Sequence, residues 1–416
     1  MNKKMAKTIL PKLRFLGFKN EPAWQEDYLG KMGEFTGGGT PSKSNDSYWK
    51  GNIPWVSSSD VSEDSIHELK ISRYITKKAI KESATKLVPE NSILLVSRVG
   101  VGKLAISKKS VCTSQDFTNF TPKKDNLTFL AYYIKSISKT LLEYSQGMAI
   151  KGFTKEDVSK LQLFLPKPAE QQKISDCLSS VDELIAAQTQ KIDALKAHKK
   201  GLMQQFFPAE GETVPKLRFP KYQDAGGWSC RILGGFISER CQLPEGRVPL
   251  YSLTIEDGIA PKTERYERSF LVKNEDKAYK LVQPGDFAYN PMNLRFGAIA
   301  RHSGEENVAV SKYYNIFYCD DSVDSRFCEI YFRSPGMIAY YDDVATGSLI
   351  EKRRVHFSDF LKFEIRFPSL DEQKKIADCL SSIDDLITVQ AHKIDALKAH
   401  KKGLVQQLFP SPKEMN

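Results

Sequence analysis

The chain has 416 residues, of which 41% are hydrophobic and 27% are charged, a composition typical of a globular protein with about two or three separately packed domains. No apolar run approaches the roughly 20 residues needed to cross a membrane, and the amino-terminal segment lacks the apolar core of a secretory signal, so we expect a cytoplasmic protein. The seven cysteines form no CxxC pair, so we expect reduced thiols and no bound metal. The formal net charge of +10 favours an anionic partner, most commonly nucleic acid.

Residues 1–166 predict a first domain of mixed α+β structure. Between about 20 and 165 the segment is rich in Gly, Ser, Asn and aromatic residues, with short apolar runs such as Ser92–Val96. This pattern is typical of strands and loops with a few helices. The run Gly100–Lys103 resembles the end of a phosphate-binding loop, but Leu104 replaces the required Ser or Thr and Ser97 replaces the first glycine, so we expect no nucleotide site.

Residues 167–208 predict a long helix with one apolar seam. Its hydrophobic positions follow a 4-3-4-3 spacing, which is the pattern of a helix that packs along another helix in a coiled coil. A polar residue on such a seam costs stability and fixes register or orientation, and Gln188 occupies this place. The predicted seam consists of Ile174, Leu178, Val181, Ile185, Gln188, Ile192, Leu195, Lys199 and Leu202.

Residues 209–368 predict a second α+β domain that is related weakly to the first. Lys280–Asp286 parallels Lys86–Ser92, and Val308–Phe317 parallels Val111–Phe120. The fold of the two domains therefore repeats while their sequences differ. Asn290–Asn293 resembles an amino-methyltransferase motif but lacks its second proline and its aromatic residue, so we expect no methyl transfer by this chain.

Residues 369–416 predict a second long helix that copies the first. About 29 of 39 positions are identical between Glu170–Pro208 and Glu372–Pro410, and Pro11–Phe15 with Trp24 recurs as Pro215–Phe219 with Trp228. A pseudo-twofold relation between the halves predicts an antiparallel helix pair; the alternative is that each helix packs on its own domain or on an external partner. The second seam consists of Ile376, Leu380, Ile383, Ile387, Gln390, Ile394, Leu397, Lys401 and Leu404.

This arrangement resembles a specificity subunit of a type I DNA restriction–modification enzyme. The resemblance covers essentially the whole chain and depends on Gly37–Ser42, Tyr48–Val56 and the two helix ends Lys200–Gln205 and Lys402–Gln407. The second domain has Ile237–Pro249 in place of the first two of these blocks, which puts the loop structure of that domain in doubt.

The resemblance implies a function. Each variable domain is then a target recognition domain that reads one half of a bipartite site in double-stranded DNA, and the helices form an antiparallel spacer that docks two modification subunits. Those subunits methylate adenine with S-adenosylmethionine, and two restriction subunits translocate and cleave DNA with ATP and Mg²⁺. The chain itself is not catalytic and holds no cofactor. Half-sites about 34–36 Å apart lie one helical turn apart on B-DNA, within reach of a helix of this length.

Candidate DNA contacts are loop residues that combine charge, amide groups and aromatic rings. Arg98 suits guanine and Gln115 suits adenine, whereas Lys43, Lys50 and Lys151 suit phosphates. Tyr48, Trp49 and Trp55 fit packing of the first domain better than DNA contact. The candidates are Thr40, Ser42, Lys43, Tyr48, Trp49, Lys50, Ser97, Arg98, Lys103, Gln115 and Lys151 in the first domain, and Asn290, Asn293, Arg295, Lys312, Tyr313, Tyr314, Lys352, Arg353 and Arg354 in the second.

Two other classes of function fit the sequence less well. An enzyme with its own nuclease or methylase chemistry needs a cofactor loop and a catalytic domain for which the chain has no spare length. A coiled-coil scaffold that joins two protein-binding domains explains the repeat, but it explains neither the basic balance nor the Gly37–Ser42 and Tyr48–Val56 blocks.

Overall fold

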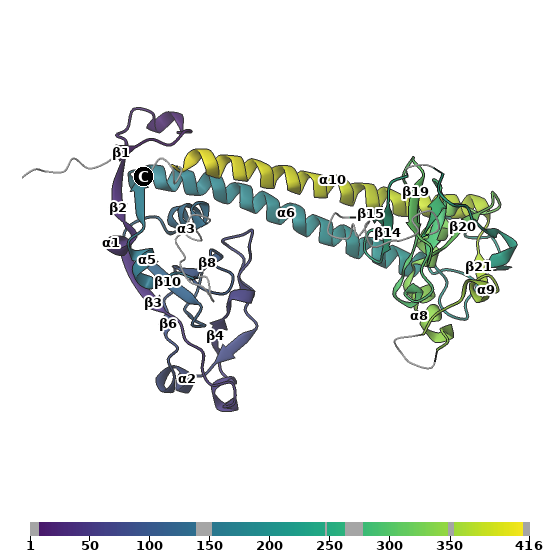
Figure 1. Ribbon diagram of the computed structural model, residues 1–416, viewed down its shortest axis with the longest axis horizontal. Helices are drawn as coiled ribbons and strands as arrows, with labels where there is room; N and C mark the ends of the chain where they lie inside the picture. Colours follow the sequence, from purple (N-terminus) through teal and green to yellow (C-terminus); the bar gives the residue numbers. More distant parts are fainter. Residues whose placement is uncertain (1–7, 139–151, 246–247, 263–277, 348–352, 411–416) are drawn as a thin grey trace, which may run out of the picture. The chain divides into compact units, whose positions relative to one another are not determined.

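The computed structural model describes residues 8–138, 152–245, 248–262, 278–347 and 353–410 (Figure 1). The predicted contacts Lys151 and Lys352 lie outside these residues. The chain divides into two units, residues 1–190 with 391–416 and residues 191–390. Each unit contains one variable head and one half of each long helix, so the four-segment division predicted from the sequence stays a prediction about domain boundaries.

The described residues of the first head form three β-sheets and four short α-helices. One sheet has the order β3-β10-β7-β8, with strands Gly33–Gly37, Phe117–Pro122, Ser92–Val96 and Leu104–Ser107. A second has the order β5-β4-β9-β6, with strands Arg73–Ile75, Ile53–Val56, Val111–Thr113 and Leu87–Val88. The third has the order β1-β2-β11, with strands Thr8–Ile9, Trp24–Tyr28 and Gln162–Leu165. The helices are α1 (Leu29–Met32), α2 (Lys77–Glu82), α3 (Leu127–Ser136) and α5 (Lys155–Ser159).

The second head repeats this plan. Its four-stranded sheet has the order β13-β20-β17-β18, with strands Ile237–Glu239, Asn315–Cys319, Phe287–Tyr289 and Ile299–Arg301. Two-stranded sheets among the described residues pair β14 with β15 (Tyr251–Thr254, Gly258–Pro261), β16 with β19 (Tyr279–Val282, Val308–Ser311) and β12 with β21 (Ser229–Ile232, Glu364–Phe367). The helices are α7 (Ser325–Phe332), α8 (Pro335–Val344) and α9 (Phe357–Phe360).

The strand orders show that the two heads have one topology. The sheets β3-β10-β7-β8 and β13-β20-β17-β18 match strand for strand in sequence order and in antiparallel pairing. The parallel pairing of Trp55 with Cys112 also returns, as a parallel bridge between Leu250 and Ala309. The predicted mixed α/β class, with two β-rich heads and two long helices packed together, is confirmed.

The long helices are α6 (Pro168–Phe206) and α10 (Leu370–Leu408), each of 39 residues. In the first unit Ile174 and Leu178 share a core with Leu408, and Asp182, further along α6, bonds to Lys401, which comes earlier on α10, so rising residue numbers on α6 meet falling numbers on α10. The helices are therefore antiparallel there. In the described chain every predicted seam side chain is buried or half-buried, because the seam faces the partner helix or the head.

A buried ion pair attaches each head to the first turn of the helix that follows it. In the first unit the Arg14 guanidinium donates to Glu170 at 2.8 and 2.7 Å, and Trp24 Nε1 donates to the same carboxylate at 3.3 Å. In the second unit Arg218 donates to Glu372 at 2.7 Å through two nitrogens. Each carboxylate also lies near the positive end of a helix dipole, which favours its charged form.

The far end of the other helix completes each core. In the first unit Phe409, just beyond α10, stacks on Tyr133 with ring centroids 4.9 Å apart. In the second unit Phe207, just beyond α6, packs edge-on against Tyr331 at 5.2 Å. Each head therefore packs against both helices, and the repeated motif supplies both sets of contacts.

A second contact joins the first head to the helices further along. The Tyr132 hydroxyl of α3 donates to Asp182 Oδ2 at 2.6 Å, and Lys401 of α10 donates to Asp182 Oδ1 at 2.6 Å. His67, from the loop before β5, places its Nε2 3.2 Å from the Tyr132 hydroxyl. We call His67, Tyr132, Asp182 and Lys401 the side clamp.

Removal of the buried carboxylate should destabilise one unit selectively. In Glu170→Gln the Arg14 guanidinium keeps its charge without an anionic partner, and we expect the first unit to lose about 3–5 kcal/mol of stability. Glu372→Gln should do the same to the second unit. Urea unfolding followed by amide hydrogen exchange measures both effects and assigns each to its unit.

The control for this experiment is the exposed pair between Lys167 and Glu21, with nitrogen and oxygen 2.6 Å apart. Lys167→Ala should change stability by no more than about 1 kcal/mol because the pair is solvated. Equal losses in Lys167→Ala and Glu170→Gln would show that burial of the pair has no special effect.

Acidification should weaken the first unit through His67. Burial lowers the pKa of the imidazole below 6.5; Asp182 and Glu183 oppose this shift, while Lys108 and Lys401 add to it. Unfolding restores the ordinary pKa, so the unfolded chain binds more protons between the two values and stability is lost as pH falls below about 6.5. The free energy of unfolding at pH 7.5, 6.5 and 5.5 should therefore fall more steeply for the natural chain than for His67→Gln. Parallel slopes would contradict this assignment.

Candidate nucleic-acid interface

Three loops and one connecting segment meet at one edge of the first four-stranded sheet. Because β10 is antiparallel to β3 and β7, the ends of β3 and β7 lie beside the start of β10. The Thr40 hydroxyl donates to Gln115 Oε1, and Ser97 N donates to Asp116 O at 2.7 Å. Phe153 N donates to Ser97 O at 3.0 Å. We call residues 38–40, 97–98, 114–116 and 152–153 the first loop cluster.

Two glycines make this close approach possible. A Cβ at Gly38 would overlap the carbonyl oxygen of Ser114, and one at Gly152 would lie 2.7 Å from the carbonyl oxygen of Ser97. Both distances are too short for a side chain, so the glycines let the backbones of the four segments pack together. The cluster is consequently a compact platform on which Arg98 and Gln115 remain exposed.

The second head has an equivalent cluster at the same edge of its sheet. Tyr289 pairs with Asn315, which places Asn290 beside the turn Lys312–Tyr314. Val355 N donates to Pro291 O at 3.1 Å, as Phe153 does to Ser97 in the first head. We call residues 240–242, 290–293, 312–314 and 354–355 the second loop cluster.

The predicted contacts of the first head fall into two groups. Thr40, Ser97, Arg98 and Gln115 lie together in the first loop cluster. The remaining described candidates lie elsewhere. Lys103 ends the β7–β8 turn with its Nζ 3.1 Å from Glu63. Tyr48 and Trp49 pack against the core of β4 and α2, and they belong with Ser42, Lys43 and Lys50 to the segment between β3 and β4.

The aromatic residues of the second group pack the head. Trp49 lies edge-on to the buried Trp55 with centroids 5.2 Å apart, and its Nε1 donates to Ser42 O at 3.0 Å. Trp55 Nε1 donates to Gly39 O at 3.0 Å. The tryptophans therefore hold the segment before β4 in place, and Trp55 also stabilises the first loop cluster through its bond to Gly39.

The contacts predicted in the second head also differ in their environments. Lys312, Tyr313 and Arg354 are exposed, and Tyr313 has 78% of its surface accessible. Arg295 and Arg353 instead contact Asp342, with nitrogen–oxygen distances of 3.1 and 3.8 Å. These two arginines hold neighbouring segments of the head together.

The remaining candidates of this head form the turns themselves. Asn290 Oδ1 accepts from Met292 N at 3.1 Å, so its amide oxygen stabilises the loop. Asn293 N donates to Asn290 O at 3.1 Å in the same loop. Tyr314 is half-buried against the second-head core.

The sequence interpretation missed residues that belong to the clusters. Asp116 accepts the backbone of Ser97, and Arg240 and Gln242 follow β13 just as Gly38 and Thr40 follow β3. Arg240 contacts the buried Asp286 at 2.6 Å. A comparison of the two sequence blocks could have found Arg240 and Gln242, because Ile237–Pro249 stands where the first head has the glycine-rich block Gly37–Ser42.

The glycine-rich run of the first head is a hairpin turn. Gly100 and Gly102 both have φ of +87°, and Lys103 N donates to Gly100 O at 3.2 Å. A strand follows, whereas a phosphate-binding loop leads into a helix. The turn therefore does not resemble a nucleotide site.

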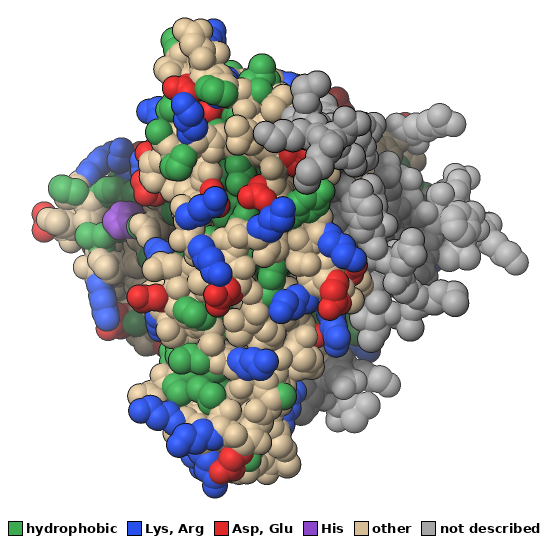
Figure 2. Space-filling model, turned by 90° about the vertical axis from the view of Figure 1, so that its left-hand side faces the viewer, with side chains coloured by type: hydrophobic (Ala, Val, Ile, Leu, Met, Phe, Trp, Pro, Cys, Tyr) green, Lys and Arg blue, Asp and Glu red, His purple; other side chains and the backbone are tan. Residues whose placement is uncertain are grey.

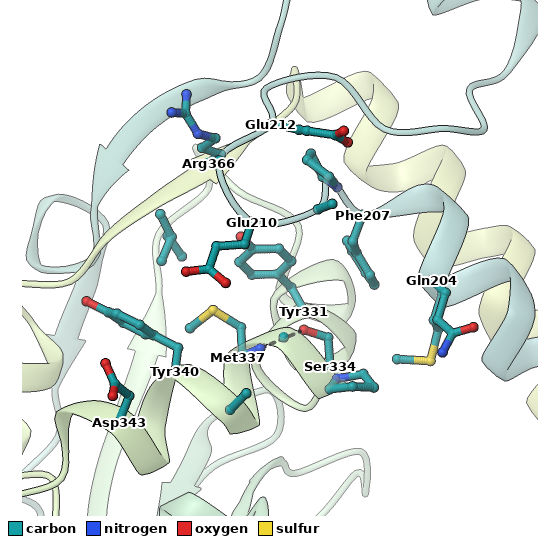
Figure 3. Close-up of a pocket in the computed structure, with 18 of the residues that line it drawn as sticks. Gln204, Phe207, Glu210, Glu212, Tyr331, Ser334, Met337, Tyr340, Asp343 and Arg366 are labelled. Carbon is teal, nitrogen blue, oxygen red and sulfur yellow. Dashed lines mark hydrogen bonds between the residues drawn. The ribbon is translucent and has the colours of Figure 1, made fainter.

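A cavity of about 750 Å³ in the second unit lies between the end of α6, α8 and β21 (Figure 3). Glu210 projects over Tyr331 and Met337 within it, and Asp343 lies at its border (Figure 3). The Ser334 hydroxyl accepts from Met337 N at 3.4 Å as the cap of α8, so this serine has a structural role. The carboxylates lining the cavity disfavour a phosphate group.

Charge on the side of the molecule that carries β1 and β2 is mixed (Figure 2). Lysine and arginine side chains alternate there with carboxylates, and hydrophobic side chains lie between them. A surface that follows a DNA backbone needs a local excess of positive charge. The mixed charge on this side does not by itself identify a DNA-binding surface.

The described part of the chain offers neither a metal site nor a membrane-spanning helix. It contains no group of three or more His, Cys, Asp or Glu side chains arranged to hold a metal ion. Among the same residues, none of the helices combines the length and hydropathy needed to span a bilayer.

The chain is similar in sequence to known DNA specificity proteins. The family model described as type I restriction modification DNA specificity domain matches residues 22–197 and 349–399. The chain is 32% identical over 222 residues to the type I restriction enzyme MjaIX specificity subunit of Methanocaldococcus jannaschii, which covers 51% of each chain. It is 31% identical over 180 residues to the EcoR124I/EcoR124II specificity subunit of Escherichia coli, covering 41% of this chain and 44% of that one. The matched regions span about half the length of these relatives.

A solved structure resembles the fold over its full length. The S subunit of a type I restriction-modification system from M. genitalium has a TM-score of 0.57 at 14% identity, and the match covers 97% of this chain and 100% of that one. At this identity the likeness concerns the fold alone.

Proposed function

The chain belongs to the family of type I restriction modification DNA specificity domains, and on this basis we propose that it is the DNA-recognition subunit of a type I restriction–modification enzyme. Each head reads one half of a bipartite site in double-stranded DNA, and the chain has no catalytic site or cofactor of its own. The observation that carries this proposal is that two heads of one topology present different side chains at the same sheet edge.

The chemistry of the clusters supports recognition of base edges. The exposed Arg98 can form two parallel hydrogen bonds with guanine, and Gln115 can do so with adenine. In the second head the exposed Lys312 and Arg354 offer positive charge to phosphates, and Tyr313 offers an exposed ring. The different residues at equivalent places support two different half-site sequences.

The outer faces of the long helices support docking of partner subunits. Leu184 on α6 and Leu386 on α10 occupy equivalent repeat positions and are 51% and 49% exposed. Val389 is 58% exposed one turn beyond Leu386. We infer that two modification subunits, which bind S-adenosylmethionine, dock on these faces, and that two ATP-dependent restriction subunits join them.

The decisive experiment co-expresses the chain with its modification subunit and maps methylated adenines across the host genome. The expected result is a split motif, with two short blocks separated by a fixed number of unread base pairs. If the folded and associated complex neither methylates nor binds DNA, the proposal is wrong and the two-headed scaffold becomes the better interpretation.

Loss of Arg98 should relax recognition of the first half-site only. We expect Arg98→Ala to weaken binding of the intact complex by about 1–3 kcal/mol, roughly five- to 150-fold, and to relax specificity at one base pair. Competition binding with single base-pair variants of both half-sites measures this. Lys19→Ala, at an exposed residue outside the clusters, is the charge-matched control and should bind normally. An equal loss at every base pair of both half-sites would contradict a base contact.

Loss of Lys312 should instead change how strongly DNA binding depends on salt concentration. A lysine that contacts one phosphate releases about one counterion, so Lys312→Ala should lower the slope of log K against log salt concentration by about 1. Binding should weaken uniformly across sequences. Titrations between 50 and 200 mM salt, roughly the range in which such slopes are resolved, measure it. An unchanged slope would exclude a phosphate contact by this lysine.

A further inference from the structure

The side clamp holds the first head at a second point along the helices. Its central group is the Asp182 carboxylate of α6, which accepts from Tyr132 of the head and from Lys401 of α10, both at 2.6 Å. Lys401 Nζ also lies 5.3 Å from the centre of the Tyr132 ring. Asp182 is only 11% exposed, so its bonds to the hydroxyl and the ammonium group are shielded from water.

The loop that carries His67 is itself firmly held. Ile66 is buried in the head core, and its carbonyl accepts from Ile106 N of β8 at 2.8 Å. Val61 and Leu69 bridge the two sides of the loop. His67 therefore reaches the Tyr132 hydroxyl from a rigid base, and the clamp joins two head segments to both helices.

The distance between attachment points decides what the clamp can do. The buried pair between Arg14 and Glu170 lies 12 residues before Asp182 on the same helix, which is about 18 Å at about 1.5 Å per residue. The buried pair and the core that Ile174, Leu178 and Phe409 share with the head hold it near the start of α6, which leaves a tilt about that region to be opposed further along the helix. A second charged hydrogen bond at this separation opposes the tilt.

Among the described residues of the second unit, nothing corresponds to the contact between Tyr132 and Asp182. Asn126 and Asp324, the N-caps of α3 and α7, occupy equivalent places. The backbone N of Asn126 donates to Gln171 of α6, and that of Asp324 donates to Gln373 of α10, both at 2.9 Å. Six residues beyond these caps stand Tyr132 and Ile330. Isoleucine has no hydroxyl group, and the pair of Lys199 with Asp384 leaves Asp384 50% exposed.

We propose that Tyr132 and His67 are positioning residues that hold the first head at a fixed tilt on the helix pair and so set how strictly the enzyme discriminates the spacing between its two half-sites. This inference rests on the proposed function. The residues touch no base; they act through the orientation of the first loop cluster. The second head has isoleucine at the equivalent place, and it contacts the helices through the buried Arg218–Glu372 pair, the more exposed Arg326–Asp378 pair and its core.

The test measures binding of the complete complex with its modification subunits to DNA in which the identified half-sites are separated by the natural spacer or by one base pair more or less. The natural chain should prefer the natural spacer. Tyr132→Phe keeps the ring and removes the hydroxyl, and it should reduce the preference about tenfold, the effect of one hydrogen bond to a charged group. Affinity for the natural spacer should change by less than about threefold.

A matched pair of variants separates the clamp from the helix pairing. Asp182→Asn and Asp384→Asn make the same change at equivalent repeat positions, but only Asp182 contacts the head through Tyr132. Asp182→Asn should relax the spacing preference, and Asp384→Asn should leave it unchanged. Amide exchange of residues 61–69 should also accelerate in Tyr132→Phe without DNA, which reports the clamp directly.

The outcomes distinguish this inference from the proposed function. If the natural complex discriminates spacing and both Tyr132→Phe and Asp182→Asn discriminate equally well, the positioning role is wrong while the proposed function stands. If the two variants only lower the melting temperature and weaken all DNAs equally, the contact is structural and the inference again fails. If the natural complex recognises no bipartite site, the proposed function fails and the positioning role fails with it.

Discussion

The buried pair between an arginine of each head and a glutamate at the start of each long helix is the constraint from which the rest of the structure follows. Arg14 also donates to the carbonyls of Glu21 and Pro22 at 2.8 and 3.0 Å, so its guanidinium fixes the segment before β2 as well as the helix. A buried ion pair adds little stability over a well-packed apolar substitute. Its contribution here is directional, because the planar guanidinium group donates two parallel hydrogen bonds to the carboxylate in one relative orientation.

That orientation is the same in both halves. Arg218 repeats the two carbonyl contacts through Ala225 and Gly226, at 2.6 and 3.1 Å, and repeats the bond to its glutamate. Both helices therefore start from the same kind of anchor and have nearly identical sequences, whereas the loops at the sheet edges differ between the heads.

The sequence predicted those parts of the structure that have a regular period. The 4-3-4-3 spacing identified both long helices, and the copied segment indicated two heads of related fold. It did not show that Thr40 meets Gln115, because strand pairing across 75 residues leaves no local pattern. The same limit applies to Arg353, whose Nε donates to Ala345 O at 3.1 Å and binds the head internally although the sequence offered it as a DNA contact.

The side clamp lies where the constant and the variable parts of the molecule meet. Asp182 and Lys401 belong to the copied helices and have equivalents in Asp384 and Lys199, whereas Tyr132 belongs to a head and is replaced by Ile330 in the other. A contact that needs one partner from each part can be gained or lost by a single substitution in a head. Two heads on nearly identical helices can therefore differ in how firmly they are attached as well as in the side chains at their loop clusters. This difference in attachment requires no change in the helices.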